Sequence, residues 1–102
     1  MKPENLIGHW VHSHEEDSPA EMIFRPANFS FPRSRGRTSF ELLPEALIDH
    51  GVGPGDAATE TRGTWSVLPD GELSLFHGTG KKPVRVLRIV SAQPDRLVVR
   101  ND

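Results

Sequence analysis

Three histidines have the residue type and spacing that a binding site could use. His12 and His14 are two residues apart, so an extended chain projects both imidazoles from the face that carries Trp10. His77 falls on the expected inward face of another strand. A His-x-His pair can present two imidazoles to one metal ion, with His77 or a nearby acidic residue as third ligand. Histidines beside an acidic loop are more often solvated or paired with carboxylates, so we predict no metal. The remaining functional interpretation is a polar rim around a small-ligand cavity.

A second group combines arginines with aromatic residues. Its members are Arg25, Phe29, Phe31, Arg33, Arg35 and Arg37. Such a set could stack bases and grip phosphates, and Arg25 and the loop arginines could equally bind a carboxylate or phosphate ligand at a barrel mouth. Alternatively, the phenylalanines cap the core and the arginines pair with Glu21 and the acidic residues at 15–17. The formal net charge of -2 favours this last interpretation over nucleic-acid binding.

Enzymatic chemistry has little support in the sequence. No Gly-x-Ser-x-Gly motif is present, and the absence of cysteine excludes thiol nucleophiles and thiolate metal sites. Three carboxylates, Glu21, Glu41 and Asp49, fall on separate predicted strands with nothing in the sequence to pair them. The glycine-rich segment 51–56 lacks the Lys-Ser/Thr of a phosphate-binding loop and is interpreted as a connection. We therefore expect a protein without a cofactor that is not an enzyme.

Length and composition fit a single soluble domain over residues 1–102. Charged residues make up 25% and hydrophobic ones 35% of the chain. No apolar run approaches the roughly 20 residues that span a bilayer, and the N-terminus does not resemble a signal peptide. The expected location is cytoplasmic, without a membrane partner.

Turn-forming residues recur every eight to twelve residues or so, which is typical of an all-β sandwich or barrel. The segments between them predict strands over 6–12, 21–25, 38–43, 59–68, 72–77, 83–91 and 95–100. Residues 44–51 fit either a short helix or a turn at Pro44-Glu45 followed by a strand, and we favour the hairpin. Short connections force antiparallel neighbours. The sequence thus predicts a small antiparallel up-and-down β-barrel of about eight strands.

Two Gly-x-Trp motifs support a barrel. Gly8-His9-Trp10 opens the first strand, and Gly63-Thr64-Trp65 recurs near the middle. The indole can fill one end of a barrel while the glycine leaves room for a crossing chain. The first strand, with Leu6-x-Gly8-x-Trp10, resembles that of the calycins, and the later hairpin resembles small bacterial lipocalin-like proteins. Full lipocalins are longer and carry an additional helix.

The resemblance implies a binding protein, since lipocalin-like barrels hold small molecules. We expect a non-enzymatic barrel that binds a small, partly apolar ligand. The residues expected to contact it are His12, His14, His77, Arg25, Arg35, Trp10 and Trp65. The alternative is a protein-interaction or enzyme-inhibitor module that uses the Arg/Phe loop or the N-terminal segment, with no internal ligand. Eight short strands enclose an interior that side chains can fill completely.

Overall fold

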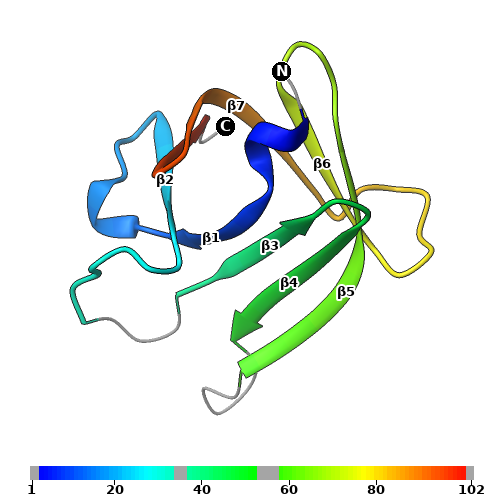
Figure 1. The fold of residues 1–102 in the computed structure, drawn as a ribbon, viewed down its shortest axis with the longest axis horizontal. Coiled ribbons are helices and arrows are strands. Elements are labelled where there is room, and N and C mark those ends of the chain that lie inside the picture. The colour runs from blue at the N-terminus through cyan, green and yellow to red at the C-terminus, as the bar shows by residue number, and fades with distance from the viewer. Residues whose placement is uncertain (1–2, 34–36, 53–57, 101–102) are drawn as a thin grey trace.

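The computed structural model describes residues 3–33, 37–52 and 58–100. Within these ranges the chain forms eight antiparallel strands that close into a barrel, which confirms the predicted fold class (Figure 1). The strands are β1 (Gly8–His12), β2 (Glu21–Pro26), β3 (Ser39–Leu43), β4 (Ala46–Val52), β5 (Ala58–Val67), β6 (Glu72–His77), β7 (Arg85–Gln93) and β8 (Arg96–Arg100). Two short 3-10 helices, η1 (Pro3–Leu6) and η2 (His14–Glu16), flank β1. In the described ranges, no helix is long and apolar enough to cross a membrane.

The strand order around the barrel is β1-β2-β8-β7-β6-β5-β4-β3, with β3 pairing back onto β1. Strands β3 to β8 follow one another as an up-and-down meander. Where the barrel closes, however, β2 pairs with β8, and β1 lies between β2 and β3. Only a short connection forces consecutive strands to be neighbours. Residues 27–38 form a connection long enough to skip a strand.

The segment after Pro44 is a strand, as favoured from the sequence. Leu43 pairs with Ala46 across a tight turn at Pro44-Glu45, and β4 continues to Val52. Leu47 is fully buried while the next residue, Ile48, is only half-buried. That alternation with a period of two suits a strand with one face on the core.

One end of the barrel is closed by η1 and its last residue, Leu6, which is fully buried. The indole Nε1 of Trp10 donates a hydrogen bond to the carbonyl of Leu6 at 2.8 Å, which ties η1 to β1. Trp65 lies partly buried against the same core, and its Nε1 donates to the Leu43 carbonyl at 2.8 Å. We call this the closed end. Both tryptophan side chains therefore help to hold this end of the barrel closed.

The barrel interior is occupied by a continuous set of buried apolar side chains. These are Leu6, Trp10, Phe24, Phe40, Leu42, Leu47, Leu73, Leu75, Leu87, Ile89, Leu97 and Val99. They come from every strand except β5, which contributes the partly buried Trp65 and Val67. Phe24 and Phe40 pack with their ring centroids 5.1 Å apart. A core of this composition supplies most of the free energy of folding in a small barrel.

The glycine of the second Gly-x-Trp motif has the role that the sequence predicts. A Cβ on Gly63 would lie 1.7 Å from the carbonyl oxygen of Phe76 on β6. The backbones of β5 and β6 approach each other here as only a glycine permits. In the first motif, Gly8 has φ +150°, a conformation that side chains rarely allow.

Candidate ligand-binding site at the polar end of the barrel

Four polar side chains face inward at the end of the barrel opposite η1. They are His12 on β1, Asp49 on β4, His77 on β6 and Arg85 on β7, and we call this group the polar end. Strand alternation places each on the core face. The register agrees, because Asp49 pairs with Phe40, His77 with Gly63 and Arg85 with Leu75. The same alternation that buries the core thus brings these four groups to one end.

Asp49 and His77 form a direct pair at the polar end. The Nε2 atom of His77 lies 2.8 Å from Oδ2 of Asp49. Strand β5 separates the two strands, but Gly63, opposite His77 on β5, has no side chain to stand between them. The two side chains are 37% and 23% exposed, so a molecule in solution can reach the pair.

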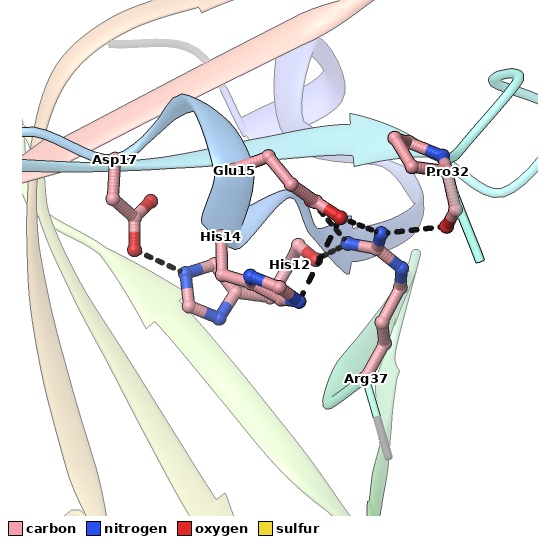
Figure 2. Close-up of polar contacts among 6 residues, drawn as sticks. All are labelled: His12, His14, Glu15, Asp17, Pro32 and Arg37. Atoms are coloured by element: carbon pink, nitrogen blue, oxygen red, sulfur yellow. Dashed lines mark hydrogen bonds and ion pairs between the residues drawn. The ribbon is translucent and has the colours of Figure 1, made fainter. Parts of the chain in front are cut away.

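His12 is fixed by a carboxylate from the turn after β1. Its Nε2 lies 2.8 Å from Oδ2 of Asp17 (Figure 2). The other oxygen of Asp17 accepts the backbone N–H of Ile23 at 2.9 Å. The His12 ring also packs on Phe24, with a centroid distance of 5.1 Å. Asp17 therefore orients the imidazole and ties the end of β1 to β2.

Arg85 differs from the other polar-end groups in its contacts. Its guanidinium lies over the Phe24 ring, 5.9 Å from the centroid. Burial lowers the pKa of this guanidinium, and the negative charge of Asp49 offsets the effect only in part. Among the described residues, Arg85 has no hydrogen bond or ion pair. An arginine remains charged in such surroundings, so the polar end holds a poorly solvated cation.

His14 lies outside β1, and its ring stands edge-on to that of His12 with the centroids 6.1 Å apart. Strand β1 ends at His12, and the chain turns through the buried Ser13 into η2. The turn is held by the N–H of Ser13, which donates to the carbonyl of Ile23 at 2.8 Å. The expectation that the extended conformation carries His14 onto the face of Trp10 is therefore wrong. The His14 side chain is 48% exposed and lies 3.8 Å from Glu15 (Figure 2).

The loop arginines bind acidic groups of the same chain. Arg25, on the outer face of β2, pairs with Glu16 through two hydrogen bonds of 2.8 and 2.7 Å. Arg37 bonds to Glu15, to the Pro32 carbonyl and to the His12 carbonyl (Figure 2). Each guanidinium also covers an aromatic ring, Arg25 that of Phe29 and Arg37 that of Phe31. Intramolecular pairing, one of the predicted interpretations, is confirmed for these two arginines. Arg35 lies outside the described residues, and Arg33 is exposed.

These ion pairs predict a measurable change in acid titration. Hydrogen bonds from Arg25 lower the pKa of Glu16 to about 2, and those from Arg37 do the same for Glu15. A carboxyl with a lowered native pKa stabilises the fold above its unfolded value of 4.5, and this contribution is lost as the pH falls towards 2. We expect Arg25→Gln to return the pKa of Glu16 towards 4.5, measured by NMR titration of the side-chain carboxyl carbons. Arg88→Gln is the control, and a Glu16 that already titrates near 4.5 in the unmodified chain would contradict the prediction.

A second polar cluster lies on the outer face of β1, β3 and β4. His50 bonds to Glu41 at 3.0 Å, and His9 lies 3.9 Å from Glu41 and 3.0 Å from the hydroxyl of Ser39. Glu21, Glu41 and Asp49 lie on separate strands, as predicted, and Glu41 and Asp49 each bond to a histidine. Ser39 is only 8% exposed, so its hydroxyl is not presented to a substrate. Burial lowers the pKa of His9, although the charge of Glu41 acts against this.

Sequence reasoning missed Asp49 and Arg85, although a signal for both was present. Asp49 alternates with the buried Leu47, and Arg85 alternates with Leu87 and Ile89, so each shares the core face of its strand. Arg85 also lies close to Lys81, Lys82 and Arg88, and such a run of basic residues is typical of a solvent-facing surface. Among the described residues, no group of three His, Cys, Asp or Glu side chains is arranged to hold a metal ion.

Trp65 lines a different feature, a surface depression of about 430 Å³ beside η1 at the closed end. Its other lining residues are Glu4, Ile7, Pro44, Ser66 and Val67. Of the seven residues predicted to contact a ligand, the structure thus places His12 and His77 together at the polar end. It places Trp10 and Trp65 at the closed end and Arg25 on the outer surface.

Comparison with known proteins adds no relative, since no family model, curated protein or solved structure matches the chain.

Proposed function

We propose that this protein is a non-enzymatic barrel that binds a small molecule at its polar end. The observation that carries the proposal is that four polar side chains from four strands lie on the core face yet are partly exposed: Asp49 bonds to His77, and His12 and Arg85 both contact Phe24. A core-facing position normally holds an apolar side chain. Four polar side chains in core-facing positions at one end of a barrel are comparable to the few polar groups that fix a ligand in a binding site.

The alternative function, protein interaction through the Arg/Phe loop, has weaker support. A docking loop needs side chains that are available to a partner, whereas Arg25 and Arg37 are bound to Glu16 and Glu15. Phe29 and Phe31 pack on each other with centroids 4.9 Å apart. These contacts order the loop against the barrel and favour the polar end as the functional surface.

The packed interior limits where a ligand can lie. Phe24 and Phe40 are fully buried inside the barrel, below the four polar groups. A ligand therefore rests on the polar end and reaches little of the apolar core. This revises the expected internal cavity to a shallow site at the mouth of the barrel.

The proposal can be tested by NMR titration of the ¹⁵N-labelled chain with small aromatic and aliphatic probes. We expect amide shifts in the residues around His12, Asp49, His77 and Arg85, with saturation at millimolar probe concentrations. Residues of η1 and the depression beside Trp65 serve as the internal reference and should not shift. Shifts confined to the closed end, or no saturable shift with any probe, would contradict the proposed location.

A further inference from the structure

Arg85 indicates what kind of ligand the polar end accepts. The guanidinium faces the barrel interior, lies over Phe24 and has no hydrogen bond or ion pair among the described residues. Asp49, whose negative charge acts on Arg85, bonds to His77 instead. Arg88 on the same strand points outward and lies 3.8 Å from Glu72. Of the two arginines of β7, Arg85 is therefore the one that faces the interior without an ion pair among the described residues.

A poorly solvated cation without a bonded acceptor is energetically costly, and an anion that binds to it removes that cost. The planar fork of a guanidinium matches the two oxygens of a carboxylate and holds them through paired hydrogen bonds. The negative charge of Asp49, which acts on Arg85, disfavours a dianion such as phosphate. The balance of charges therefore selects a monoanion.

The shape of the site limits the size and form of the ligand apart from its acid group. The interior below Arg85 is filled by Phe24, Phe40 and Leu75, all fully buried, so a long alkyl chain has no space to enter. The partly exposed ring of His12 packs at a tilt on Phe24, the same phenylalanine that the Arg85 guanidinium contacts. A compact planar body can lie on that ring while its acid group reaches Arg85.

We propose that the polar end binds a small aromatic carboxylate, with the carboxylate held by Arg85 and the aromatic ring against His12. This inference rests on the proposed function and specifies its ligand class. It assigns to Arg85 the anchoring role that the sequence suggested for Arg25 and Arg35.

The first experiment compares matched probes on the unmodified chain by NMR titration. Benzoate should bind at the polar end at least about tenfold more tightly than benzamide, because charge-assisted hydrogen bonds are worth more than neutral ones. Hexanoate and inorganic phosphate should bind more weakly than benzoate. Equal affinity for benzoate and benzamide overturns the inference but leaves the proposed function intact. Tighter binding of hexanoate overturns the aromatic part, and tighter binding of phosphate overturns the carboxylate part.

The second experiment tests the anchoring residue. Arg85→Gln should lower the affinity for benzoate about tenfold or more, while Arg88→Gln, a change of the same type on the same strand, should leave it unchanged. Circular dichroism shows whether each variant is folded, and Arg85→Lys, which keeps the charge but loses the fork, supplies an intermediate affinity. Equal losses in both arginine variants, or none, overturn the role of Arg85. If no probe binds at the polar end of the unmodified chain, the proposed function fails together with the inference.

Discussion

Gly63→Ala is expected to prevent the chain from folding into the closed barrel. The added Cβ would lie 1.7 Å from the Phe76 carbonyl oxygen, 2.7 Å from its carbon and 2.9 Å from the Cα of His77. All three atoms belong to the backbone of β6, so no rotation of a side chain relieves the contact. Separating β5 from β6 would break the ladder that continues to Val67 and Leu73. The loss should exceed about 4 kcal/mol, which is exceptional for one substitution.

Gly78→Ala is the matched control for this prediction. Gly78 has φ +55°, and nothing lies within 4 Å of an added Cβ, so only backbone strain of about 1 kcal/mol is expected. Urea denaturation followed by circular dichroism measures both variants. A Gly63→Ala protein that unfolds at the same urea concentration as Gly78→Ala would show that β5 and β6 do not approach as described.

Trp10→Ala should have the second-largest effect, a loss of about 3–5 kcal/mol. Trp10 is 3% exposed within the core at the closed end, and its indole also satisfies the Leu6 carbonyl. Replacement by alanine leaves a cavity and releases η1 from the closed end. For a domain of this size, the melting temperature should fall by at least about 12 °C.

Trp65→Ala provides the comparison for Trp10→Ala. It removes an identical side chain with an equivalent hydrogen bond, to the Leu43 carbonyl, but from a partly buried position. Its loss should be smaller, since less apolar area leaves the core and water can fill the space. Thermal denaturation of the two variants under the same conditions gives the difference. A larger loss of stability in Trp65→Ala than in Trp10→Ala would contradict the conclusion that Trp10 holds η1 on the closed end.

The fold could be predicted to a large extent because neighbouring residues in the sequence specify most of its strands and turns. Turn-forming residues such as Asp70-Gly71 mark the ends of strands directly, and the pairing of Val67 with Leu73 confirms that hairpin. Pairing of β2 with β8 could not be predicted, since it depends on the long connection of residues 27–38 and on no local signal. The resemblance to lipocalin-like barrels stays a prediction.

The candidate site was predictable only in part. His12 and His77 could be found because histidine on an apolar face is conspicuous. Arg85 is the first residue of β7, after a turn rich in polar residues, where a charged residue usually faces solvent. Asp49 lies in the middle of β4 next to the polar His50, so its own position gave no clear sign of which face it occupies. Only the register of the strands shows that both face inward. The prediction for His14 was wrong because it assumed that the strand continues past His12, whereas η2 begins at His14.

The seam of the barrel has a consequence for how the protein folds. Strand β8 pairs with β2, so that Glu21 meets Arg100 and Phe24 meets Leu97. The hairpin of β1 and β2 and the meander of β3 to β8 can each begin to form from nearby residues, but neither encloses a core alone. Joining segments this distant in the chain is slow, which places folding in the range of milliseconds to seconds. During synthesis, the edges of β2 and β7 therefore stay open to other chains until residues 96–100 have emerged from the ribosome.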